Sequence, residues 1–201
     1  IFADKKNGLT NKAPSLIINL INNGSISSGK DSGLGNSAGS TITSMTNTGT
    51  ISAVRNVGLN NKGAIGTITN SGTISAGAQF GLQITESSST ITSLINTNTG
   101  TISAGTNNGL RNKGTIGTII NSGTISAGTN DSGLFNDDTG IITELTNSGI
   151  ISAGGNFAIN NQGSIGTLTN TGSILFQSTG ISNAGTITTF NNLQGTFINS
   201  Q

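Results

Sequence analysis

The 201-residue sequence predicts an all-β fold: a right-handed parallel β-helix, or β-solenoid, of about eight three-strand coils of 22–26 residues. Three observations lead to this prediction. The stretch at 58–77 recurs at 109–128 with 17 identical residues in 20. Within both copies, Leu or Ile alternates with Asn and Gly at every second position, the period of an extended strand. Only 7% of the residues are charged, against about 25% in an average globular protein.

A seven-residue motif, apolar-x-Asn-x-Gly-x-apolar, occurs twice in each repeat and sets its register. In the copy at 109–128, the first occurrence starts at Leu110 and the second at Ile119. Length varies mostly between "ISAG" and the next "GL", and also in the first arm of some repeats, as in "GLQITESSSTI" against "GLNNKGAI", so insertions are expected in loops. The Ile that closes the first motif recurs every 22 to 26 residues, at Ile17, Ile42, Ile65, Ile91, Ile116, Ile142, Ile165 and Ile187.

Three short strands are expected in each repeat, around "GL", around "IGTI" and along "TIS". The Asn-x-Gly step marks a turn, because these residues tolerate positive φ or bond their own backbone. A unit this small cannot bury a core alone, whereas stacked units share one. A hairpin at each Asn-x-Gly step is the alternative, but antiparallel pairing does not explain the long period. The right-handed sense follows the general preference for parallel connections.

Asparagine recurs at two positions of the repeat, and stacking predicts two ladders of amide hydrogen bonds. A satisfied bond contributes about 1 kcal/mol and a buried orphaned amide costs about 1 to 3 kcal/mol, so each ladder is expected to be all-or-nothing, which explains the strict repetition of Asn. Insertions at "NTNTG" and "NNLQG" leave a second register open in the second ladder. The first ladder, interrupted at Ile84, comprises Asn11, Asn36, Asn61, Asn112, Asn136, Asn161 and Asn183. The second comprises Asn22, Asn47, Asn70, Asn96, Asn121, Asn147, Asn170 and Asn192.

Composition argues against most enzyme classes. The chain has no His and no Cys, which removes the imidazole base, the thiolate nucleophile and the common zinc ligand sets. We therefore expect no catalytic residue and no cofactor. A net charge of +1 provides no basic stripe, so nucleic acid is not an expected partner. Apolar runs are only a few residues long, so no membrane-spanning segment is expected.

The few charged residues allow two further predictions. Asp131, Asp137, Asp138 and Glu144 gather within one coil, where a solvated loop is the simpler interpretation and a weak Ca²⁺ site the alternative. Three basic residues are expected to face outward and serve solubility: Lys62, Arg111 and Lys113. Near the C-terminus, Phe190 and Phe197 are expected to fill a widened core.

Repeated segments such as "NSGTISAG", "NTGTISA" and "NSGIISAG", alternating with arms of the "GLNNKGAIGT" type, resemble the passenger domains of bacterial autotransporters (type V secretion). The resemblance extends from about Gly8 to Gly195. It implies a right-handed β-helix that is extracellular or displayed on a Gram-negative outer membrane, with roles in adhesion, self-association or biofilm. Residues 1–201 are then expected to form a single solenoid domain, a piece of a longer repeat passenger.

The third strand of the repeat carries a candidate binding face, because Thr and Ser flank its inward Ile. Their hydroxyls are expected about 6.7 Å apart along a strand and about 4.8 Å apart between coils. This array resembles that of ice-binding solenoids, although Ile150 and Leu175 interrupt it. Three functions stay open: adhesion to a host protein or glycan or to a second copy, ice binding, and a filament subunit joined by end-to-end strand addition. The face comprises Thr50, Ser52, Thr73, Ser75, Thr101, Ser103, Thr124 and Ser126.

Overall fold

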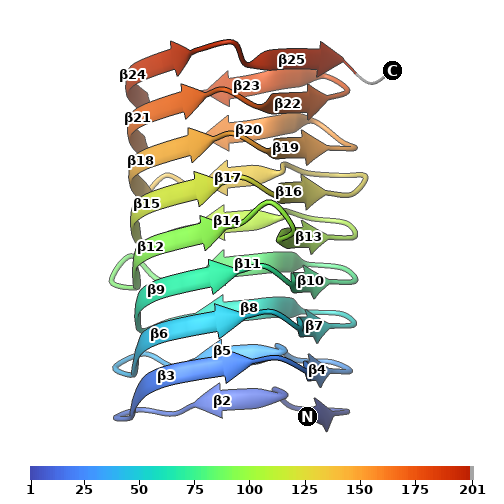
Figure 1. The fold of residues 1–201 in the computed structure, drawn as a ribbon, viewed down its shortest axis with the longest axis vertical. Helices are drawn as coiled ribbons and strands as arrows, with labels where there is room; N and C mark the ends of the chain where they lie inside the picture. The colour runs from blue at the N-terminus through green and yellow to red at the C-terminus, as the bar shows by residue number, and fades with distance from the viewer. Residues whose placement is uncertain (200–201) are drawn as a thin grey trace.

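Three parallel sheets run along the molecule, each taking one strand from every coil (Figure 1). In this computed structural model, which describes residues 1–199, each strand pairs with the strands one coil before and one coil after it. The predicted β-solenoid of about eight coils is therefore confirmed, and the described residues contain no helix.

We name the sheets A, B and C in the order in which the chain enters them. Sheet A contains β1 (Phe2–Ala3), β4 (Ser25–Ser28), β7 (Thr50–Ala53), β10 (Thr73–Ala76), β13 (Thr101–Ala104), β16 (Thr124–Ala127), β19 (Ile150–Ala153), β22 (Ser173–Phe176) and β25 (Thr196–Asn199). Sheet B contains β2 (Leu9–Asn11), β5 (Leu34–Asn36), β8 (Val57–Asn61), β11 (Phe80–Ile84), β14 (Leu110–Asn112), β17 (Leu134–Asn136), β20 (Phe157–Asn161) and β23 (Thr179–Asn183). Sheet C contains β3 (Leu16–Asn22), β6 (Thr41–Asn47), β9 (Ala64–Asn70), β12 (Thr90–Asn96), β15 (Thr115–Asn121), β18 (Ile141–Asn147), β21 (Ser164–Asn170) and β24 (Thr186–Asn192).

The coil has the right-handed sense. In Figure 1 the chain rises from the N-terminus at the bottom, and the strands of sheet C, nearer the viewer, run from left to right. The strands of sheet B lie behind them and run from right to left. A path that moves right in front and left behind while rising is a right-handed coil.

The Ile anchors stack as the sequence predicts. Each pairs in register with its copy in the next coil, from Ile17 with Ile42 to Ile165 with Ile187. In the repeat at 109–128, Leu110, Ile116 and Ile119 are fully buried. The interior is thus a set of parallel columns of Leu and Ile, each residue packing on its own copy.

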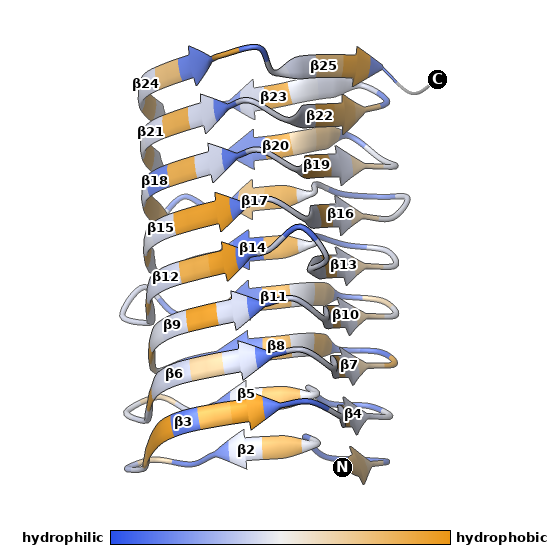
Figure 2. Ribbon diagram, in the orientation of Figure 1, coloured by the Kyte–Doolittle hydropathy of each residue, from blue (hydrophilic) through white to orange (hydrophobic). Residues whose placement is uncertain are grey.

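The long strands of sheet C depart from strict alternation at one step. In β9, Ile65 and Ile68 both point inward, so the two residues between them, Gly66 and Thr67, both lie toward solvent. This outward pair separates the two motif occurrences, and both motifs therefore contribute to one seven-residue strand. Figure 2 shows hydrophilic ends on β15, β18, β21 and β24, and each of these strands, like β9, ends in Asn.

Glycine is required at the turns for a steric reason and not for the positive φ that the sequence predicts. Among residues 1–199, positive φ occurs only at Gly39 and Gln194, so the Asn-x-Gly steps do not use it. A Cβ on Gly123 would instead overlap the carbonyl oxygen of Gly100, one coil below. The backbones of successive turns approach too closely for any side chain, which explains why Gly recurs there.

The two C-terminal aromatic residues continue the inward columns. Phe190 stacks in register on Leu168, and Phe197 on Ile174. Their rings meet edge to face, with centroids 6.4 Å apart. Both rings are exposed, at 47% and 40%, and lie outside the buried core, so they do not fill a widened core as the sequence predicts.

Candidate functional site

The second Asn ladder is continuous through all eight of its members. Each Nδ2 donates to the Oδ1 of the next Asn at 2.7 to 2.9 Å. The amide of Asn121 also donates to the carbonyl oxygens of Gly123 and Ile150, at 3.3 and 3.0 Å. The register adopted at the two insertions is the predicted one, because Asn96 and Asn192 both accept from the previous member.

The first ladder consists of two segments separated at Ile84. Asn11, Asn36 and Asn61 form one segment, and the four members from Asn112 to Asn183 form the other. Ile84 fills the gap between Asn61 and Asn112 in register.

Local backbone groups satisfy the two amides that border this gap. Asn61 Nδ2 donates to the Thr90 carbonyl at 3.0 Å, and Asn112 Oδ1 accepts from the Gly114 N–H at 3.1 Å. Ser89 Oγ, beside the gap, is the one buried side-chain polar atom without a partner among residues 1–199. The ladder is therefore not all-or-nothing where a neighbouring backbone group can replace the missing amide.

The predicted hydroxyl face exists as two columns on the outer side of sheet A. Thr50, Thr73, Thr101 and Thr124 stack in register in one column. The other column, which runs parallel to it, contains Ser52, Ser75, Ser103 and Ser126. All eight residues are half-buried, as expected for short side chains on a flat sheet.

The hydroxyls of these eight residues, which we call the hydroxyl face, make no hydrogen bond to other described residues. Both columns continue toward the N-terminus through Ser25 and Ser27. Toward the C-terminus they meet Ile150 and Leu175, the predicted interruptions. The face is thus a bounded array of hydroxyls open to an external partner.

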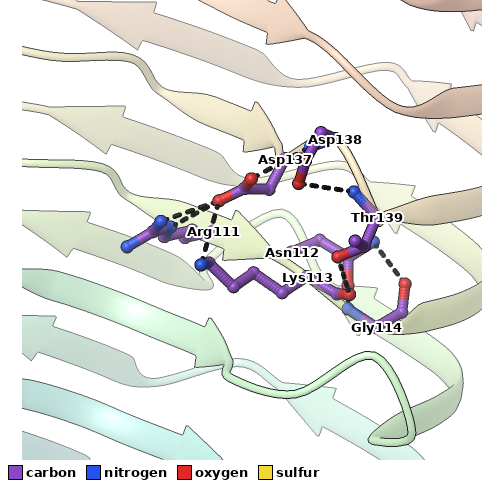
Figure 3. A network of polar contacts seen from close by, with 7 residues as sticks. All are labelled: Arg111, Asn112, Lys113, Gly114, Asp137, Asp138 and Thr139. Atoms are coloured by element: carbon purple, nitrogen blue, oxygen red, sulfur yellow. Dashed lines mark hydrogen bonds and ion pairs between the residues drawn. The ribbon is translucent and has the colours of Figure 1, made fainter.

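A charged cluster on sheet B was not foreseen from the sequence. Arg111 on β14 donates through Nε and Nη2 to Asp137 Oδ2 at 3.2 and 2.7 Å, and Lys113 Nζ lies 3.7 Å from the same oxygen (Figure 3). The guanidinium also lies 5.3 Å from the ring centroid of Phe80 and 5.7 Å from that of Phe135. This corrects the prediction that Arg111 serves solubility: its side chain is only 24% exposed and is held by an ion pair and two aromatic rings.

The environment of Asp137 perturbs its acidity. Burial raises the pKa of this carboxyl, but hydrogen bonds from Arg111 and Asp138 together outweigh burial and hold the pKa below its ordinary value. The Asp138 N–H donates to Asp137 Oδ1 at 3.0 Å. Asp137 is therefore ionised in the folded protein at neutral pH and neutralises Arg111.

The acidic residues predicted to gather in one coil do not form a metal site. Within the described part of the chain, no group of three or more potential metal-ligating side chains lies close enough to hold an ion. Asp137 faces two cations instead, and Glu144 is an exposed residue on β18 of sheet C. The structure thus assigns Asp137 to a structural ion pair.

No protein-family model, curated protein or solved structure matches this chain. In residues 1–199, no helix is long and apolar enough to cross a membrane. The features that bear on function are therefore those of the solenoid itself: its ladders, its hydroxyl face and the hollows between its turns.

Proposed function

We propose that this solenoid is a non-enzymatic adhesive or structural element of a secreted or cell-surface protein. In this proposal the hydroxyl face of sheet A contacts a host surface protein, a glycan or a second copy of the chain. The observation that carries the proposal is the pair of hydroxyl columns, whose eight members stack in register and whose hydroxyls have no hydrogen-bond partner among the described residues.

Rigidity supports this role. The strands that carry the face are held by parallel pairing on both sides, and the Asn ladder fixes the adjoining turns. A surface that is already ordered loses little conformational entropy on binding, so many weak hydroxyl contacts can add up. The resemblance to autotransporter passengers agrees with an extracellular or outer-membrane location and with self-association.

A bead assay tests the proposal. The wild type, biotinylated at an added terminal tag, coats microspheres that are scored for clustering and for binding to mucin-coated glass. We expect Ser75→Lys/Ser103→Lys, which places two ammonium groups on the hydroxyl face, to abolish adhesion. The matched control is Thr67→Lys/Ser93→Lys, an in-register outward pair on sheet C in the same two coils. Equal adhesion of both variants, or wild-type beads that neither cluster nor bind, would refute the proposal.

Ice binding is a second candidate, favoured by the uninterrupted threonine column of four adjacent coils. Its hydroxyls repeat at about the strand spacing of 4.8 Å, a regular array that can order water. Thermal hysteresis at millimolar protein is the test, and its absence removes this candidate. Electron microscopy of the same sample examines the filament alternative, which predicts long fibres in place of rods of about 40 Å.

A further inference from the structure

Two hollows meet at Lys62, on the corner between sheets B and C. Each encloses about 300 Å³, and Lys62 lines both. This volume is at the lower end of the range for small-ligand sites, so each hollow suits a ligand of about one sugar ring. They are adjacent through Lys62, and the first is mainly polar whereas Ala38, Gly39 and Ala64 contribute to the second.

The first hollow lies on the outer face of sheet B. Gly35 and Asn60 are neighbours in the outward column of this sheet, and the Asn7 side chain lies over Gly35, where a Cβ would otherwise stand, and lines the hollow. Arg111, two coils beyond Asn60, and Phe135, three coils beyond it, occupy the same column and cover the sheet. The hollow is therefore specific to the N-terminal half of the described chain.

The second hollow arises from the alternation of long and short turns between sheets B and C. A turn at 37–40 joins β5 to β6, and one at 85–89 joins β11 to β12, whereas only Lys62 and Gly63 join β8 to β9. The longer turns project at the left of the coil in Figure 1. They lie two coils apart, about 9.6 Å along the axis, and the short turn forms the floor between them.

The groups around Lys62 are polar and in part unused. Lys62 is exposed and has no ion-pair partner among the described residues, unlike Lys113 at the equivalent position. The Asn56 side chain makes no hydrogen bond to a described residue, and Asn60 uses only Oδ1, which accepts from Thr85 Oγ1. Asp31 lines the same hollow and is exposed. One ammonium, free amides and one carboxylate therefore face a space of sugar size.

We propose that these two hollows bind an acidic glycan, with a sugar carboxylate on Lys62 and the ring hydroxyls on Asn56, Asn60 and Asp31. The ammonium donates charge-assisted hydrogen bonds to the carboxylate. The amides donate to hydroxyl oxygens, and Asp31 accepts from hydroxyl groups. The second hollow receives the next sugar unit of the chain. This inference rests on the proposed adhesive function and names the ligand class of a surface distinct from the hydroxyl face.

NMR titration of the ¹⁵N-labelled protein tests the site. The probes are trigalacturonic acid and a hyaluronan tetrasaccharide, each paired with its carboxyl-methylated, uncharged ester. We expect saturable shifts of the Asn56 and Asn60 amides with at least one acid and none with its ester. Lys62→Ala should weaken binding by about tenfold, the loss of one charge-assisted contact. Lys113→Ala, the matched control in the equivalent turn, should leave binding unchanged.

A second variant tests the hollow independently of the charge. Asn60→Arg places the residue found at Arg111 in the same column, so it should fill the first hollow and abolish binding. Three outcomes would overturn the proposal. The first is the absence of a saturable shift with either acid at 10 mM, a concentration that corresponds to a binding free energy of about −2.7 kcal/mol. The others are equal binding of acid and ester, and unchanged affinity after Lys62→Ala. Bead adhesion through sheet A can still be observed in each case, so failure here is distinguishable from failure of the proposed function.

Discussion

Replacing Asn121 by Ala tests how much one rung of the second ladder contributes to stability. Asn121 is fully buried, accepts from Asn96 Nδ2 and donates to Asn147 Oδ1, both at 2.8 Å. In this variant Asn96 keeps its hydrogen bonds to the Gly100 and Thr124 carbonyls, so Asn96 loses only one hydrogen bond, at a cost of about 1 kcal/mol. Asn147 Oδ1 loses its only donor in the described structure and becomes a buried orphan, at about 1 to 3 kcal/mol. The bonds from Asn121 Nδ2 to the Gly123 and Ile150 carbonyls are lost as well, so the expected cost is at least about 2 to 4 kcal/mol.

No backbone N–H is available to donate to Asn147 Oδ1 in this variant, in contrast to the first ladder. Gly114 N–H donates to Asn112 Oδ1 beside Ile84, but the corresponding Gly149 N–H already donates to the Asn121 carbonyl at 2.9 Å. Asn121→Asp keeps the size of the side chain yet removes the donor, and its charge is then buried. We expect it to be more destabilising than Asn121→Ala at pH 7.

Equilibrium urea denaturation, followed by circular dichroism, measures these free energies. Ser126→Ala is the control, because it shortens an outward side chain whose hydroxyl has no protein partner in the described residues. If Asn121→Ala costs within about 0.5 kcal/mol of Ser126→Ala, which is the range of ordinary surface substitutions, the assignment of energy to the ladder is refuted.

Two further predictions concern groups that the fold leaves unusual. Ser89→Ala removes a buried hydroxyl that has no partner among the described residues, and it should stabilise the protein by about 1 kcal/mol in thermal or urea unfolding. Ser40→Ala removes a donor to the Asn11 carbonyl and should destabilise the protein by a similar amount. Equal effects of the two substitutions would contradict this reasoning. The pKa of Asp137 is lower in the folded protein than its ordinary value of 3.8. The stabilisation by the ionised carboxylate is therefore complete above pH 3.8 and is lost as the pH falls through the folded-state pKa. Urea denaturation of wild type and Asp137→Asn from pH 6 to 2 should therefore show a stability difference that shrinks below about pH 4, and a constant difference would refute it.

The sequence predicted the parts of the fold that repeat. Periodic Ile and Asn positions determine which residues stack, since a shift of one residue would turn Ile116 and Ile119 outward and Asn121 away from its copies. The register was therefore predictable except at the insertions beside Asn96 and Asn192, where the pattern allowed a second choice and the structure adopts the one that continues the ladder. The gap at Ile84 was visible as well, but its compensation by the Gly114 N–H depends on turn geometry that the pattern does not encode.

The features that differ between coils were harder to predict. Arg111, Phe80, Phe135 and Asp137 come from three coils, and only their stacking shows that they form one cluster. The hollows at Lys62 likewise depend on side chains of different coils, such as Asn7 and Asn60, and on unequal turn lengths. Periodicity identifies what each coil shares with its neighbours, whereas such sites arise where neighbouring coils differ.

Like residues of successive coils stack in parallel register along two asparagine ladders. Side-chain amide cross-peaks in a ¹⁵N-edited NOESY spectrum measure this stacking directly. The structure predicts cross-peaks that link the amide protons of Asn121 with those of Asn96 and Asn147, 25 and 26 residues away. Absence of these cross-peaks, together with contacts between Asn112 and Asn121 across a hairpin, would contradict the solenoid.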